Sequence, residues 1–421
     1  MASAVISNNA HRLGVLRHGN FTLYLAARLL ATLAVQMQSV AIGWQVYAMT
    51  GSMFNLGLIG LAQFAPFLVL ILYAGHAADR YDRRRIITVC IGAQLLCGLS
   101  FLVFTWWGLT VVWPIFLVLV LFGSARAFVM PASQAMLINM VPPESFSKAV
   151  ALSSSAFHVA VIAGPVLGGA LYLAGPGTVY AVVAVLLFLA VILMLRTRAT
   201  PQATNREPAT WYGVLEGLRF VWSRPIVLGA ISLDLFAVLF GGATALLPAI
   251  ARDILQVGPT GLGLLRAMPA IGSAVTSIAL TFFPIARRVG CWMFGGVALF
   301  GAGTVVLGLT TSIAVALIAL LLMGIGDMVS VYIRHLLVQH ATPDAIRGRV
   351  SAVNSVFIGA SNELGEFESG ITAGWFGLIP AVLLGGVATL AVTVAWSLGF
   401  PLLSRMDRFP HASKGEDAPI D

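Results

Sequence analysis

The stretch Gly75-His76-Ala77-Ala78-Asp79-Arg80-Tyr81-Asp82-Arg83-Arg84-Arg85 is a short, highly charged island between two long apolar segments. Apolar residues predominate from Leu56 to Ala74 before it and from Ile86 to Trp107 after it. A hydrocarbon core about 30 Å thick needs roughly 20 apolar residues per helix. The stretch therefore predicts two membrane-spanning helices that are joined by a basic loop.

The composition of the whole chain agrees with a membrane protein. Of its 421 residues, 59% are hydrophobic and only 10% are charged, whereas soluble domains carry about 25% charged residues. A soluble enzyme is thereby excluded. The net charge of +8 raises the question of which side of the membrane is basic, and we expect no nucleic-acid partner.

The same length criterion predicts an all-α polytopic protein with twelve spans, because helices satisfy every backbone polar group inside lipid. In the first half the spans are Phe21–Met49, Leu56–Ala74, Ile86–Trp107, Val112–Met140, Lys148–Leu173 and Val179–Leu195. In the second half they are Ile226–Ile250, Leu262–Phe283, Cys291–Thr311, Ile313–His340, Val350–Phe376 and Ala381–Leu403.

The basic residues predict the orientation. Nineteen of the 24 Lys and Arg residues fall in the two tails and in the loops after every second span. Cytoplasmic loops are the ones enriched in Lys and Arg. Both termini are therefore expected in the cytoplasm, which requires an even number of spans.

The chain also divides into two similar halves. A polar stretch from Arg196 to Arg224 separates six spans from six, and its part from Trp211 to Trp222 alternates aromatic and charged residues like a helix in the membrane interface. Local matches between the halves, such as Pro143-Glu144 with Pro343-Asp344, favour a parallel repeat. We predict an N-terminal six-helix bundle over 1–195, a cytoplasmic linker over 196–224, and a C-terminal six-helix bundle with a cytoplasmic tail over 225–421.

The charged island matches a known loop signature, Gly-x-x-x-Asp-Arg-x-Gly-Arg-Arg. The matching residues are Gly75, Asp79, Arg80, Arg83 and Arg84. The chain thereby resembles the major facilitator superfamily, which implies a 6+6 helix fold and alternating access. The resemblance also implies that this loop ties the bundles together and biases their states. Asp82 stands where the family has its second Gly, so the local turn is expected to differ.

A second motif lies in the fifth span, Gly164-Pro165-x-x-Gly168-Gly169. Small residues let helices approach closely, and Pro removes a backbone donor, so ordinary packing is one interpretation. In the resembling family this pattern is associated with proton-driven exporters. In overall character the chain is most similar to the bacterial drug and siderophore efflux branches, including the enterobactin-exporter-like group.

Ionisable residues inside the spans are candidates for substrate binding or proton coupling, because each costs at least about 2.5–3.5 kcal/mol at the bilayer centre. Pairing among them is the structural alternative. Another candidate is Gln36, which shares a polar stripe of the first span with Arg28 and Ser39 and suggests a cavity wall. The ionisable candidates are Arg28, Arg126, Asp234, Arg266, Asp327, Arg334, Glu363, Glu366 and Glu368.

Three of these carboxyls lie within six residues of the eleventh span. Glu363 and Glu366 share a helix face, while Glu368 points away from both. Two carboxyls this close in a low dielectric do not both ionise readily, so the pair could carry a proton in exchange for substrate. Salt bridges to an arginine of another span, such as Arg28 or Arg126, are the alternative.

The expected function is secondary active transport by alternating access, with proton-coupled export of a drug or a siderophore-like molecule. An importer or uniporter of a small polar metabolite with the same fold is one alternative, and a membrane receptor without transport is another. The chain has no P-loop, HExxH or GxSxG motif, so neither an enzyme, a metal nor a cofactor is expected. We expect a monomer in the bacterial inner membrane whose partners are substrate, protons and lipid.

Overall fold

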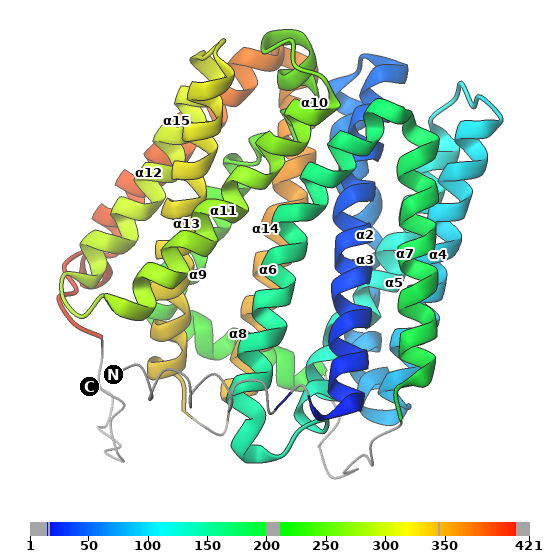
Figure 1. Ribbon diagram of the computed structural model, residues 1–421. Helices are drawn as coiled ribbons and strands as arrows, with labels where there is room; N and C mark the ends of the chain where they lie inside the picture. Colours follow the sequence, from blue (N-terminus) through cyan, green and yellow to red (C-terminus); the bar gives the residue numbers. More distant parts are fainter. Residues whose placement is uncertain (1–14, 16, 199–210, 344–345, 410–421) are drawn as a thin grey trace, which may run out of the picture. The chain divides into compact units, whose positions relative to one another are not determined.

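The computed structural model is built from helices (Figure 1). It describes residues 15, 17–198, 211–343 and 346–409, and no strand occurs in these ranges. The prediction of an all-α fold is confirmed.

Six long helices cover the first half of the chain. Local signals mark their ends: the Ser52 side chain accepts a hydrogen bond from the Asn55 amide at the start of the second, and Gly51 and Gly175 adopt positive φ values in the turns. The helices are α2 (Gly19–Thr50), α3 (Met53–Arg80), α4 (Arg83–Trp106), α5 (Trp113–Ile138), α6 (Phe146–Leu171) and α7 (Pro176–Arg196).

The second half begins with a short helix that precedes the next spans. Its long helices are α8 (Trp211–Ser223), α9 (Pro225–Phe240), α11 (Pro259–Phe282), α12 (Val289–Leu309), α13 (Ile313–Ala341), α14 (Arg347–Phe376) and α15 (Leu378–Gly399). Two short helices, α10 (Leu247–Ala249) and α16 (Pro401–Ser404), complete it.

Eleven segments of the described chain are long and apolar enough to cross a membrane. The one predicted span outside this set, the eleventh, is present as α14, a single helix of 30 residues. It falls outside the eleven because Glu363, Glu366 and Glu368 lower its hydropathy. The structure is therefore consistent with the predicted twelve-helix fold.

The seventh span differs from the prediction of one helix over Ile226–Ile250. Helix α9 ends at Phe240, the chain passes through Gly241 and Gly242, and a 3₁₀ turn (Ala243–Leu246), α10 and a π-helical turn (Ile250–Ile254) follow. A Cβ atom on Gly242 would lie 2.4 Å from the carbonyl oxygen of Gly365. Gly242 lies directly beside the backbone of α14, and Gly241 lies against the Phe300 ring of α12, so neither position accepts a larger side chain.

By their packing the residues form two compact units. The first unit comprises Met1–Ala209, Thr244–Ala270 and Gly370–Leu378; the second comprises Thr210–Ala243, Ile271–Ser369 and Ile379–Asp421. Part of the second half of the sequence thus packs with the first six spans. The bundle boundaries at 195 and 225 remain a prediction.

Close backbone contacts hold the first unit together. Helix α3 packs along α5, and a Cβ on Gly123 would lie 2.2 Å from the carbonyl oxygen of Gln63. At the end of α14, a Cβ on Gly370 would lie 2.5 Å from the Cα of Gly57. Side chains larger than hydrogen do not fit at these crossings.

The second unit uses the same device. Gly296 of α12 and Gly326 of α13 face each other, so that a Cβ on either would lie within 2.6 Å of the other's carbonyl oxygen. Its apolar core includes the fully buried residues Leu233, Met293 and Ile333.

Helix α8 confirms that the predicted linker contains a helix. It runs across the direction of the long helices of its own unit (Figure 1), and only Arg224 separates it from the start of α9. Val221 is buried against Val350 and Val353, while the Trp222 side chain is exposed. One face of this amphipathic helix therefore packs on other residues of the second unit.

We predict that Gly123→Ala destabilises the protein by about 1–3 kcal/mol, because the added methyl group overpacks the α3–α5 crossing. The matched control is Gly92→Ala in α4, where nothing lies within 4 Å of the new Cβ and the higher helix propensity of Ala is neutral or stabilising. Thermal unfolding of the purified protein in detergent measures both. Equal unfolding midpoints for the two variants would contradict the packing assignment.

Candidate functional site

The most deeply buried charges of the second unit form an ion pair. The Arg334 guanidinium on α13 contacts the Asp234 carboxylate on α9, and the two residues are 1% and 5% exposed. Each charge neutralises the other in a low-dielectric environment, so neither is buried alone. These two candidates are therefore paired with each other, and a role in coupling remains a prediction.

The polar face of α13 extends beyond this pair. Ser330 lies one turn before Arg334 and Asp327 lies two turns before it, which places all three on one side of the helix. The Arg334 Nε and the Ser330 hydroxyl have no hydrogen-bond partner in the described part of the chain. Asp234 thus covers only part of the hydrogen-bonding capacity of this face.

The carboxylates of α14 lie beside the interruption of the seventh span. Gly365 packs against the carbonyl groups of Val238 and Leu239 at the end of α9, and Glu363 and Glu366 flank it in the sequence. Glu363, Glu366 and Glu368 are all partly exposed, and each makes polar contacts. The structure therefore brings the α14 carboxylates to the point where α9 ends.

In the first unit, the polar stripe of α2 is largely occupied by packing. A Cβ on Gly164 would lie 2.5 Å from the Cβ of Gln36, so Gln36 is pressed against α6. Ser39 accepts a hydrogen bond from Arg266 of α11. Arg28 lies beside the Tyr24 hydroxyl; Arg28 and Gln36 are partly exposed, and Ser39 is exposed.

The Gly-Pro motif of α6 lies at a junction of three helices. Gly168 packs on the backbone of Met37 in α2, while Gly169 packs on Pro259 and Gly263 at the start of α11. Pro165 also meets α11, because a Cβ on Gly263 would lie 2.3 Å from its carbonyl oxygen. The motif thus joins α6 to α2 and to the segment Thr244–Ala270 within the first unit.

Near the end of α2, a polar contact not anticipated from the sequence joins the same segment to α2 within the first unit. The Tyr47 hydroxyl donates to the Asp253 carboxylate. The Arg252 guanidinium lies 5.9 Å from the centre of the Tyr47 ring and donates to its carbonyl oxygen at 3.4 Å. The available signal was the isolated charged pair Arg252-Asp253 between two apolar spans.

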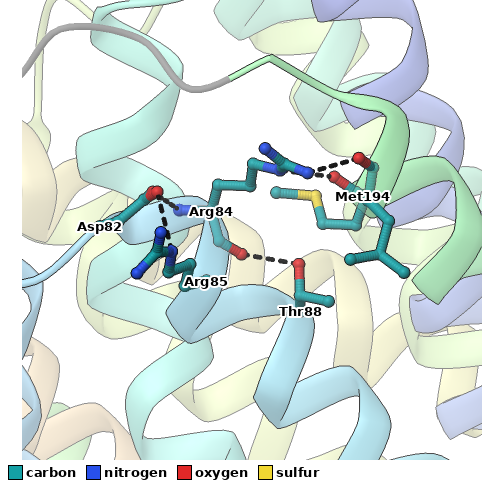
Figure 2. Close-up of polar contacts among 6 residues, drawn as sticks. Asp82, Arg84, Arg85, Thr88 and Met194 are labelled. Carbon is teal, nitrogen blue, oxygen red and sulfur yellow. Dashed lines mark hydrogen bonds and ion pairs between the residues drawn. The ribbon is translucent and has the colours of Figure 1, made fainter.

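The basic loop is shorter than predicted, because α3 continues to Arg80. Gly75 lies inside that helix rather than at its end, so it serves no left-handed cap. The Asp82 carboxylate caps α4 by accepting a hydrogen bond from the Arg84 amide at 2.9 Å (Figure 2). Arg80 is exposed, and the side chain of Asp79 lies outside the described residues.

Two arginines of this loop bind the carboxyl ends of neighbouring helices. Arg83 donates to the carbonyl oxygens of Ala78 and Ala135, at 3.1 and 3.0 Å. Arg84 donates to the carbonyl oxygen of Met194 at 3.2 Å and to that of Leu195 (Figure 2). Cations are favourable at helix C-termini, where the last carbonyl groups have no partner within the helix. These contacts join α3, α5 and α7 within the first unit, and a role in biasing conformational states remains a prediction.

Among the remaining candidates, Arg126 is exposed in the middle of α5. No group of three His, Cys, Asp or Glu side chains that could hold a metal ion occurs in the described part of the chain.

Comparison with known proteins places this arrangement in context. Residues 24–366 match the sequence profile of the Major Facilitator Superfamily. The enterobactin exporter EntS of Escherichia coli O1:K1 / APEC is 26% identical over 396 residues, covering 92% of this chain and 90% of that protein.

Solved structures with a similar fold are also transporters. A bacterial homologue of the human lysosomal transporter Spinster, in an inward-facing and unoccupied conformation, has a TM-score of 0.71 at 18% identity and covers 92% of this chain and 97% of that one. The nucleoside transporter NupG has a TM-score of 0.69 at 12% identity, over 90% of this chain and 99% of that one. At these identities the likeness concerns the fold.

We predict that Asp234→Asn destabilises the protein by about 3–5 kcal/mol, because it leaves the buried Arg334 without a counter-charge. Replacing both residues, as Asp234→Asn with Arg334→Gln, should recover much of that loss. The control is Asp407→Asn, which removes the exposed partner of Arg287 at 3.8 Å and should change stability by less than about 1 kcal/mol. Thermal unfolding midpoints in detergent test this order; a double variant less stable than Asp234→Asn would contradict it.

A second prediction concerns the basic loop. Arg84→Gln should destabilise the protein by up to about 1.5–3 kcal/mol, because charge-assisted hydrogen bonds to two carbonyl groups of α7 are lost. The neighbouring change Arg85→Gln is the control. The Arg85 side chain is 86% exposed, and its ion pair with Asp82 is long, at 3.7 Å, so its loss should change stability little. Denaturation of the two variants should therefore differ clearly, and identical curves would show that capping of α7 contributes nothing.

Proposed function

Because the chain belongs to the Major Facilitator Superfamily, we propose that it exports a small molecule in exchange for protons by alternating access. Its relatives and its fold are those of multi-pass membrane transporters rather than enzymes, which confirms the family and the non-enzymatic class predicted from the sequence. The direction of transport, the coupling ion and the mechanism are the proposal.

The observation that carries proton coupling is the buried Asp234–Arg334 pair. With Asp234 ionised the pair is neutral, and α9 and α13 are held together. Protonation of Asp234 leaves the Arg334 charge buried without a counter-charge, which strongly disfavours that arrangement. A proton thereby shifts the balance between two packings of α9 and α13, as a coupling site requires. Glu363 and Glu366, beside the end of α9, are the second candidates for this role.

Two observations support export. The Gly164-Pro165-x-x-Gly168-Gly169 motif, associated with proton-driven exporters in the family, occupies the junction of α6 with α2 and α11. A relative that matches 92% of the chain is named an enterobactin exporter. The proposed substrate is therefore a drug or a siderophore-like molecule.

Backbone features support alternating access. The seventh span changes from the second unit to the first beside Gly241 and Gly242, and α11 changes from the first to the second directly after Pro269. A helix interruption and a proline are places where a helix bends most readily. In the opposite state of the transport cycle, the contacts of Thr244–Ala270 with α2 and α6 would separate. The interruption at Gly241 and Gly242 and the proline at Pro269 would act as the hinges.

The basic loops support a location in the bacterial inner membrane with both termini in the cytoplasm. In that orientation Tyr47, Asp253 and the α6–α11 junction lie toward the outer face. We propose a monomer as the transporting form.

The test uses everted membrane vesicles acidified inside, with a pH-sensitive dye and with enterobactin and ethidium as probes. A transported probe should raise the internal pH of wild-type vesicles, because protons leave as it enters. In the neutral double variant Asp234→Asn with Arg334→Gln, or else in Glu366→Gln, this pH change should be at least tenfold smaller. Each variant should still be inserted into the membrane at normal levels. Asp407→Asn is the control and should retain it.

Other outcomes distinguish the alternatives. Full coupling in both test variants would exclude these carboxylates as the coupling site. Flux in the opposite direction would indicate an importer, and flux independent of the gradient a uniporter. If deletion of the gene leaves cellular accumulation of both probes unchanged, a receptor without transport is favoured.

A further inference from the structure

Exposed arginines gather at one end of the second unit. Successive spans run in opposite directions, so α9 and α12 begin at the end where α11 finishes and where α16 follows α15. In the proposed orientation this end faces the cytoplasm. Its exposed basic residues are Arg224, Arg287, Arg288, Arg405 and Arg408.

The short helix α16 connects two of the helix starts that carry these arginines. Leu403 of α16 is fully buried. A Cβ on Gly290 of α12 would lie 2.3 Å from the carbonyl oxygen of Leu403, and a Cβ on Gly229 of α9 would lie 3.3 Å from its Cδ2. The first turns of α9 and α12 therefore both contact α16. Arg224 directly precedes α9 and Arg288 directly precedes α12, so both arginines lie at the rim of this junction.

The segment after α16 brings further arginines to the same place. The Arg288 amide donates to the Asp407 carboxylate at 3.1 Å. The same carboxylate lies 3.8 Å from the Nε of Arg287 and 3.8 Å from the Nε of Arg408. In Figure 1 the C-terminal end of the chain, in red, lies beside the loop between α11 and α12. Three arginines thus surround one carboxylate.

The charge of this end is strongly positive. Asp407 is the one acidic residue in the segments 222–229, 282–293 and 400–409, which carry the five arginines. Four positive charges are therefore in excess, and a partner of opposite charge is favoured here.

Large apolar side chains are exposed among the arginines. Each of them is more than half exposed: Trp222, Phe282, Phe283, Trp292 and Leu402. Aromatic side chains of this kind are enriched where the hydrocarbon of a bilayer meets its polar head groups. A purely aqueous anion would leave these side chains in water, whereas a lipid would cover them.

The length of α12 places the arginines at the level of the lipid phosphates. The helix has 21 residues, which at 1.5 Å per residue is about 30 Å, the thickness of the hydrocarbon core. Arg287 and Arg288 directly precede it. They therefore lie just outside the hydrocarbon, while Trp292, one turn beyond Arg288, lies at its edge.

We propose that the five arginines and the apolar side chains among them form a lipid-binding surface for an anionic phospholipid of the cytoplasmic leaflet. The guanidinium groups bind the phosphate oxygens, since their paired donors match that geometry. The exposed aromatic rings contact the glycerol and the acyl chains. This surface is separate from the transport chemistry, and lipid bound to it holds the cytoplasmic end of the second unit at the membrane surface.

Lipid binding to the purified full chain in detergent tests the proposal, with native mass spectrometry as the measurement. The probes are dioleoyl phosphatidylglycerol, dioleoyl phosphatidylcholine and inorganic phosphate. Phosphatidylglycerol should bind at least tenfold more tightly than phosphatidylcholine, which has no net charge. Inorganic phosphate should displace it poorly, because phosphate has no acyl chains to cover the aromatic rings.

Paired substitutions locate the surface. Arg287→Gln with Arg288→Gln should weaken binding of phosphatidylglycerol at least tenfold, because each arginine near an anionic lipid surface contributes a factor of about five. Arg287→Lys with Arg288→Lys keeps both charges and should retain most of the affinity. Arg405→Gln with Arg408→Gln changes a different segment and should give a loss similar to that of the first pair.

The matched control removes two exposed arginines of the first unit, as Arg17→Gln with Arg85→Gln, and should leave this binding unchanged. Thermal unfolding identifies a variant that does not fold. If the glutamine pair at 287 and 288 does not fold, the pair at 405 and 408 decides. Binding is measured without transport, so a failure here and a failure of proton-coupled export are told apart.

The proposal is overturned if phosphatidylcholine binds as tightly as phosphatidylglycerol, if neither lipid is retained, if inorganic phosphate competes as well as phosphatidylglycerol itself, or if the two glutamine pairs bind the lipid like the control.

Discussion

Direct contact between helix backbones is the constraint on which the rest of this structure depends. Lipid gives apolar helix faces little reason to prefer each other over lipid chains, so association relies on close packing and on polar contacts. Glycine permits that packing: Gly123 meets Gln63 in the first unit, and Gly296 meets Gly326 in the second. At such spacing, rotating or sliding one helix against its neighbour causes a clash. The contacts therefore fix which faces of the helices oppose each other.

The placement of charge follows from this fixed packing. Asp234 and Arg334 are 100 positions apart in the sequence and meet because α9 and α13 pack together. A buried ion pair and a row of partly exposed carboxylates are two different answers to the cost of charge in lipid.

Conformational change needs places where this packing yields. The seventh span is interrupted at Gly241 and Gly242, and Pro269 lies inside α11. Both positions fall where the chain passes between the two compact units. The segment between them is attached to α2 and α6 by the Gly169–Pro259 contact and by the Tyr47–Asp253 hydrogen bond.

The sequence by itself determined the order and approximate position of the spans and the existence of α8, because hydropathy and amphipathic pattern are properties of each segment alone. It also identified the basic loop, the Gly-Pro motif and the charges inside the spans. Only the tertiary structure decided that Arg334 pairs with Asp234, that Arg84 caps α7, that Tyr47 binds Asp253 and that the seventh span breaks at Gly241. Each of these depends on which helix lies opposite, and that choice is made by backbone fit between segments distant in the chain, which no local pattern records.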